Sequence, residues 1–357
     1  MKSMTTDGRR RGGGANRTMS ILSTRCLLVA LLGTANLANG AGAAQSIAVP
    51  PLQLRSIADI PLGGHPTRLD YASLDVGRHL LFIAHLGDSE VIVFDTEARR
   101  VVRRIANVSH VHGVLAIPDL GRVYASATGT NEVVAIDEET LRISARMPGG
   151  IYPDGLAYSP EAHKVYVSDE HGGTDTVLDV LTNTRVATVQ IDGEIGNTQY
   201  DDSSHHMFVS AQSTNQLVEV DPKTDMIVRR IQVPGAKENH GLLIDSAAHR
   251  AFVACQGNDQ LIVIDLRTGA AIAQLPVAKD PDVLAFDARL QTLYVAGESG
   301  QVSEFKVLDG QISKTGESLL APNAHVVAIH PTTHEIYFPL KDVDGKPVLR
   351  IMRGGKE

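Results

Sequence analysis

The sequence predicts an all-β fold, a seven-bladed β-propeller with four-stranded blades, and three observations support this prediction. An aromatic residue recurs at intervals of 42 to 44 residues, short stretches rich in β-branched residues alternate with Gly, Asp, Asn or Pro, and no stretch keeps a helical period. Four short strands per unit, repeated seven times, are typical of blades around a central axis. A β-sandwich would not keep so constant a period.

The recurring aromatic residue marks one strand in each unit, within segments such as RVYAS and KVYVS. Because the position is invariably apolar, we expect it in the core between blades. The markers are Phe82, Tyr124, Tyr166, Phe208, Phe252, Tyr294 and Tyr337. A second marker is an Asp at the end of stretches such as NEVVAID. It appears as Asp95, Asp137, Asp221 and Asp265.

The two ends of the repeat array predict how the ring closes. The last unit has three strand-like stretches, at about 325–330, 335–339 and 347–352, and no fourth one follows. The stretch LQLRSIADIPL, at about 52–62, resembles the fourth strands of the other units. We therefore expect this N-terminal strand to complete the last blade and to remove the exposed edges. The blade repeats run from about 63 to 353, and residues 45–357 are predicted to form one domain.

Residues 1–44 match the pattern of a signal peptide. A basic stretch precedes the apolar run CLLVALLGTANLA, and Ala41-Gly42-Ala43 provides the small residues of a cleavage site. The apolar run is too short to span a bilayer, which needs about 20 residues; a buried N-terminal helix is the alternative reading. We therefore expect a periplasmic or secreted protein, without a membrane span after signal removal.

The chain that remains after residues 1–44 is strongly acidic. The full sequence has 33 Lys and Arg against 41 Asp and Glu, and without the predicted signal the balance is 27 against 40, a net charge of −13. Such a surface lacks the positive potential that attracts phosphate backbones, so no nucleic-acid partner is expected. Cys255 is then the single cysteine, and we expect it to be a small buried residue rather than a nucleophile.

The position 12 residues before each aromatic marker carries the clearest chemical signal. In a propeller this position begins the innermost strand, at the mouth of the central channel. The column contains Asp70, His112, Asp154, Gly196, His240, Asp282 and His325, with Asn197 beside the gap at Gly196. Its Asp and His side chains are candidate ligands for a divalent cation, for a small molecule, or for acid–base chemistry. The alternative is that they only line a solvent-filled channel.

A second ring is predicted in the turns between the second and third strands. Its polar members would surround the first ring at the same face and contact a polar ligand, with solvated turns as the alternative. These candidate ligand-binding residues are Glu170, Gln212, Gln256 and Glu298, with His85 beside the ring. Five histidines in the opposite turns are predicted to be turn residues rather than ligands. They are His79, His163, His205, His249 and His334.

The pattern PDGLAYSPEAHKVYVSDE, followed by a strand of the VIVFD type, resembles the YVTN-repeat propellers, a group that includes the YncE-like exported proteins. The resemblance covers nearly all of the chain after residue 44 and implies seven blades and export. It brings no shared catalytic motif. The sequence also lacks the GxSxG, P-loop and CxxCH motifs, so whether the protein is an enzyme stays open.

Three functions fit these observations. The leading one is binding of a small polar ligand or a partner protein at the Asp/His-lined mouth. The second is a lactonase-like hydrolase in which a divalent metal ion in the same ring polarises a carbonyl and activates water. The third is a non-catalytic scaffold for protein interactions, since a propeller by itself does not imply chemistry. No cofactor is certain, and a divalent metal ion is the one that the ring could hold.

Overall fold

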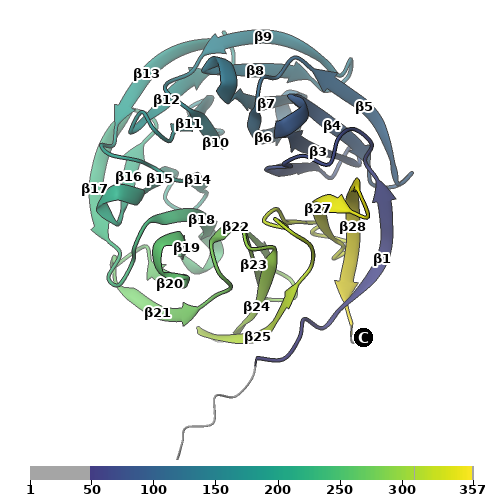
Figure 1. Ribbon diagram of the computed structural model, residues 1–357. Coiled ribbons are helices and arrows are strands. Elements are labelled where there is room, and N and C mark those ends of the chain that lie inside the picture. The colour runs from purple at the N-terminus through teal and green to yellow at the C-terminus, as the bar shows by residue number, and fades with distance from the viewer. Residues whose placement is uncertain (1–48, 309, 356–357) are drawn as a thin grey trace, which may run out of the picture. The chain divides into compact units, whose positions relative to one another are not determined.

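The computed structural model describes residues 49–308 and 310–355, which belong to one compact unit, Ala48–Glu357. The predicted signal peptide therefore lies outside the described residues. The unit consists of seven four-stranded antiparallel sheets that stand around a central axis as blades (Figure 1). The seven-bladed β-propeller predicted from the repeat period is confirmed. Among the described residues, helical structure is limited to six three-residue 3-10 turns.

Each blade begins at the axis and runs outward, one strand after another (Figure 1). The innermost strands of blades one to seven are β2 (Ala72–Asp75), β6 (Val111–Ile117), β10 (Pro153–Ser159), β14 (Thr198–Asp201), β18 (Asn239–Asp245), β22 (Pro281–Asp287) and β26 (Ala328–Ile329). The second strands are β3 (Leu80–His85), β7 (Arg122–Ala127), β11 (Lys164–Asp169), β15 (His206–Ala211), β19 (Arg250–Cys255), β23 (Thr292–Gly297) and β27 (Ile336–Val343).

The outer half of each blade follows the same order. The third strands are β4 (Glu90–Asp95), β8 (Glu132–Asp137), β12 (Thr174–Asp179), β16 (Gln216–Asp221), β20 (Gln260–Asp265), β24 (Gln301–Leu308) and β28 (Lys346–Gly354). The outermost strands are β5 (Arg100–Ala106), β9 (Arg142–Pro148), β13 (Thr184–Gln190), β17 (Met226–Gln232), β21 (Ala271–Pro276), β25 (Gln311–Leu319) and β1 (Leu54–Pro61). The 3-10 turns are η1 (Leu86–Asp88), η2 (Pro118–Leu120), η3 (Thr128–Thr130), η4 (Gln212–Thr214), η5 (Ser246–Ala248) and η6 (Gln256–Asn258).

The two ends of the described chain meet in blade seven. Strand β1 pairs antiparallel with β28, from Leu54 opposite Gly354 to Pro61 opposite Val348. The sheet order is β1-β28-β27-β26, so the first of the described strands is the outermost strand of the last blade (Figure 1). This pairing covers the outer edge of β28, which would otherwise offer unpaired backbone groups.

The core lies between neighbouring blades, where the strands are buried on both faces. All seven aromatic markers are at most 5% exposed. The middle strands are almost continuously buried, whereas outermost strands such as β9 and β17 alternate between exposed and buried residues. This difference follows from position, because an outermost strand has one face toward solvent.

Polar residues define the turns between strands. The second marker, Asp95, begins a turn in which its Oδ1 accepts the backbone N–H groups of Glu97 at 3.0 Å and Ala98 at 2.7 Å. Such Asx turns fix the reversal without help from a ligand. The five histidines predicted as turn residues have positive φ angles of 51° to 61° between the first and second strands. Their turn role is confirmed.

Candidate functional site

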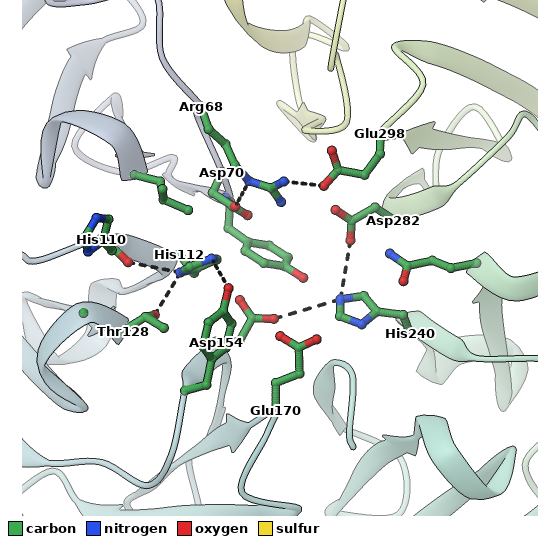
Figure 2. A pocket seen from close by; sticks show the side chains of 15 residues that line it. Arg68, Asp70, His110, His112, Thr128, Asp154, Glu170, His240, Asp282 and Glu298 are labelled. Atoms are coloured by element: carbon green, nitrogen blue, oxygen red, sulfur yellow. Dashed lines mark hydrogen bonds and ion pairs between the residues drawn. The ribbon is translucent and has the colours of Figure 1, made fainter. Parts of the chain in front are cut away.

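A pocket of about 600 Å³ opens at the axis, where the innermost strands begin (Figure 2). Side chains from several blades converge on it, and five of the six ionisable residues of the predicted column are among them. The lining residues are Arg68, Asp70, Tyr71, Leu86, His110, His112, Thr128, Gly129, Tyr152, Asp154, Glu170, His240, Gln256, Asp282 and Glu298.

The six ionisable residues of the column come from six different blades. The second residues of β6, β10, β18 and β22 are His112, Asp154, His240 and Asp282, respectively. Asp70 precedes β2, and His325 precedes β26. His325 does not line the pocket, but its fully buried ring lies against it, with Nε2 3.9 Å from Asp70 Oδ2 and 4.0 Å from Asp282 Oδ2. The register therefore places these side chains together.

A glycine directly after the column residue allows neighbouring blades to approach at the axis. Gly113 and Gly241 are two such positions. A Cβ on Gly113 would overlap the carbonyl oxygen of Asp154, and one on Gly241 would overlap that of Asp282. The small residue of one blade thus makes room for the column residue of the next.

We expect Gly241→Ala to destabilise the protein by about 1–3 kcal/mol, the usual range for overpacking a close contact. The obstacle is backbone of the next blade, which cannot rotate away as a side chain could. Gly354→Ala is the matched control, because nothing lies within 4 Å of a Cβ at Gly354. Urea unfolding of both variants measures the difference, and equal stability of the two would contradict this account of the contact.

The three column histidines are oriented in the same way. In His112 and His325, Nδ1 is 3.0 Å from the carbonyl oxygen of the residue two positions earlier, and in His240 it is 2.9 Å from Gln212 Oε1. These acceptors place a proton on Nδ1 and direct Nε2 toward the axis. His240 Nε2 is 3.7 Å from Asp282 Oδ1, and that oxygen has no hydrogen-bond partner among the described residues.

The pocket has an excess of negative charge. Five carboxylates line it, and among its described lining residues Arg68 carries the single permanent positive charge. Burial raises the pKa of Asp154 well above its ordinary value, and the charges of Asp70 and Glu170 raise it further. Burial also raises the pKa values of Asp282 and Glu170. Negative charge in this pocket is therefore held at a cost in free energy.

Arg68 and His325 partly balance these charges. Arg68 Nε donates to Asp70 Oδ2 at 2.8 Å, and its Nη1 lies 2.6 Å from Glu298 Oε1 (Figure 2). Burial opposes the charge of Asp70, but the nearby His325 and Arg68 outweigh it and hold its pKa well below the ordinary range. Burial likewise opposes the charge of His325, yet Asp70 and Asp282 raise its pKa to about 9. His325 is therefore cationic at neutral pH.

The structure places the four residues of the predicted second ring at two kinds of position. Glu170, Gln256 and Glu298 line the pocket. Gln212 is not among the lining residues and holds His240 by the hydrogen bond given above. Asn197, beside the gap at Gly196, accepts a hydrogen bond from the Tyr71 hydroxyl at 2.5 Å.

His85 does not belong to the central pocket, and its placement there is corrected. Its ring is fully buried and lies 3.0 Å from Thr67 Oγ1, beside Asp88 and Glu90. His85 is the last residue of β3 and is not among the residues that line the pocket. The next residue, Leu86, begins the turn η1 and does line it.

Four lining residues were missed by sequence reasoning: Arg68, Tyr71, Gly129 and Tyr152. A signal for two of them was available, because Arg68 and Tyr152 each lie two positions before a column residue. His110, which also lines the pocket, occupies the same register. The loop that enters the innermost strand thus contributes to the site as well as the strand itself.

Two groups of side chains in the described part of the chain could hold a metal ion. One is Asp282, Glu298 and His325 at the central pocket, and the other is His85, Asp88 and Glu90. In each group, one ligand atom per residue lies within 4.8 Å of the others. Both combine carboxylate oxygen with imidazole nitrogen, a donor set that suits divalent transition metals.

Comparison with known proteins supports the fold. No family model matches the sequence, and no curated protein matches it. Among solved structures, hydrazine synthase from Kuenenia stuttgartiensis superimposes with a TM-score of 0.69 at 14% identity, over 87% of this chain and 99% of that chain. At this identity the likeness concerns the fold alone, and a fold by itself does not imply a function. None of the described helical segments is long and apolar enough to cross a membrane.

Proposed function

We propose that this chain is an exported, YVTN/YncE-like propeller that binds a small polar ligand with a positively charged group in its central pocket. The observation that carries the proposal is the charge of the pocket, where five carboxylates face Arg68 and the buried His325. A cationic group would offset both the burial and the carboxylate repulsion that raise the pKa of Asp154. The rings of Tyr71 and Tyr152 line the same space and can contact such a group by cation–π attraction.

The size of the pocket favours a small molecule over a protein segment. Its volume of about 600 Å³ lies within the range of small-molecule sites, roughly 300–1,000 Å³. Its polar groups come from several blades, so one compact ligand can contact them simultaneously. A partner protein would instead rest on the rim, and its binding would not depend on the buried Asp154 and Asp282.

Asp154→Asn tests the proposal. We expect this variant to lose at least about tenfold in affinity for a cationic ligand found by thermal-shift screening, equivalent to about 1.4 kcal/mol. Without ligand it should be at least as stable as the wild type, because it removes a repelled buried charge. Glu97→Gln, which neutralises an exposed carboxylate, is the control. Unchanged affinity in Asp154→Asn would refute the proposal.

A metal-dependent hydrolase of the lactonase type is the second candidate. It is supported by the arrangement of His240, Asp282 and His325, in which both histidine Nε2 atoms lie 3.7–4.0 Å from Asp282. A bound divalent ion there would displace the proton that His325 otherwise carries, polarise a carbonyl and lower the pKa of a coordinated water. In this reading the acceptors of the Nδ1 atoms orient the ligands. Lactone hydrolysis by metal-loaded protein, absent in Asp282→Asn, would favour this candidate; no turnover with any divalent metal would exclude it.

A further inference from the structure

A second cluster of ionisable residues lies where the ring closes, apart from the central pocket. His85 ends β3, Asp88 belongs to η1 and Glu90 begins β4. They face the segment 63–67, which links the closing strand β1 to blade one. An open pocket of about 410 Å³ leads to the cluster from solvent.

The hydrogen bonds of Thr67 fix the protonation of His85. Thr67 Oγ1 donates to Asp88 Oδ1 at 3.3 Å and lies 3.0 Å from His85 Nε2. A hydroxyl group has a single hydrogen, so Thr67 must accept from His85 Nε2–H. The Nδ1 atom of the neutral ring therefore has a free lone pair, and it is buried without a hydrogen-bond partner among the described residues.

This lone pair points at two carboxylates. His85 Nδ1 is 3.6 Å from Asp88 Oδ2 and 3.4 Å from Glu90 Oε1, and it is buried without a hydrogen-bond partner among the described residues. Arg104 donates to both oxygens of Glu90 and to the carbonyl groups of residues 62 and 63, and the backbone N–H of His65 donates to Asp88 Oδ2. Each of the two carboxylate oxygens keeps a second lone pair, whereas His85 Nδ1 has no donor among the described residues. A cation between the three atoms would satisfy this buried nitrogen.

We propose that His85, Asp88 and Glu90 form a binding site for a divalent transition-metal ion such as Zn²⁺. Imidazole nitrogen with carboxylate oxygen is a donor set that this class of ion prefers over Ca²⁺ or Mg²⁺. His65 is available to complete the coordination, because its Nδ1 is 3.1 Å from Asp88 Oδ1 and its side chain is 82% exposed. Glycine at position 64 allows the chain to pass close to the cluster, since a Cβ there would overlap Arg104 Nη2 and Asp88 Oδ2.

The metal ion would connect two parts of the chain that belong to different blades and meet where the ring closes. Segment 63–67 continues from β1, which belongs to the sheet of blade seven, whereas β3 and β4 belong to blade one. A shared ligand set would therefore hold blade seven to blade one. Binding to the folded state alone raises stability in proportion to the logarithm of metal concentration, so Zn²⁺ should raise the melting temperature.

Titration of chelator-treated protein with Zn²⁺, and with Co²⁺ followed by its visible absorption, tests the site. We expect the wild type to bind one equivalent of metal ion. In His85→Gln and Asp88→Asn the affinity should fall at least about a hundredfold, more than is typical when a residue that contacts only a metal ligand is changed. Thr67→Val, which removes the group that orients His85, should lose about tenfold.

Variants of the central pocket distinguish a failure of this proposed metal site from a failure of the proposed function. Asp282→Asn and His325→Gln should still bind the one equivalent of metal ion that His85→Gln no longer binds. The bound ion should also still raise their melting temperature. If His85→Gln does not fold, the half-buried Asp88 provides the same test. Undiminished metal binding in Asp88→Asn, loss of the equivalent in Asp282→Asn alone, or no binding to the wild type would each overturn the proposal, whatever the central pocket binds.

Discussion

Raising the pH from 6 to 10 is expected to lower the free energy of unfolding by about 3 kcal/mol through His325 alone. The pKa of this residue is about 9 in the folded protein and 6.5 in the unfolded chain, and each unit of difference corresponds to about 1.4 kcal/mol. Because its ring is fully buried, little solvent screening reduces the effect. Urea unfolding of metal-free protein at several pH values measures it.

The sign follows from proton binding. Between pH 6.5 and 9 the folded protein keeps the proton on His325, whereas the unfolded chain has released it. The stabilisation is therefore complete below pH 6.5 and is lost as the pH rises through 9. Other groups also titrate in this range, so the pH dependence of the wild-type free energy of unfolding is compared with that of His325→Gln. The variant should lack the loss of stability that is due to His325. A variant with the same pH dependence as the wild type would show that His325 is not held as an imidazolium ion.

Phe252→Ala is expected to destabilise the protein by about 3–5 kcal/mol, the usual cost of removing a buried aromatic ring. Phe252 is fully buried between blades five and six, with its ring centroid 5.6 Å from that of Phe286 and the guanidinium of Arg250 5.3 Å away. The blades are rigid sheets that cannot collapse into the space left by the ring.

Met226→Ala provides the control for this prediction. Met226 is also an apolar residue in a strand, but it is 66% exposed, so its loss should change stability by no more than about 0.5 kcal/mol. Urea unfolding of the two variants should separate them clearly. A small effect of Phe252→Ala would mean that the aromatic positions do not carry the packing between blades.

The fold could be predicted because its information is repeated along the chain. Each blade needs an apolar residue at the marker position and an Asp or Gly in its turns. This pattern is weak in a single blade, but its repetition over seven blades made it recognisable. The column was predictable for the same reason, because every innermost strand begins at the axis. Asp154 and His240 lie 86 residues apart, yet their shared register placed them in one pocket.

The errors arose where one blade departs from the others. His85 occupies the position of Ala127, Ala211 and Cys255, all of which are buried, so comparison across blades would have indicated a buried ring rather than a ligand contact. Arg68 was missed because no residue type recurs consistently at its position from blade to blade. Its role depends on the charges of Asp70 and Glu298, which come from blades one and six.

Binding of matched small molecules that differ only in charge tests the central claim most directly. An alkyl diamine, the diol of the same length and the corresponding dicarboxylate can be compared by calorimetry on the wild-type protein. The charge of the central pocket predicts that the diamine binds at least about tenfold more tightly than the diol, and that the dicarboxylate does not bind. Preferential binding of the dicarboxylate at Arg68, or equal affinity for all three compounds, would contradict the proposed function.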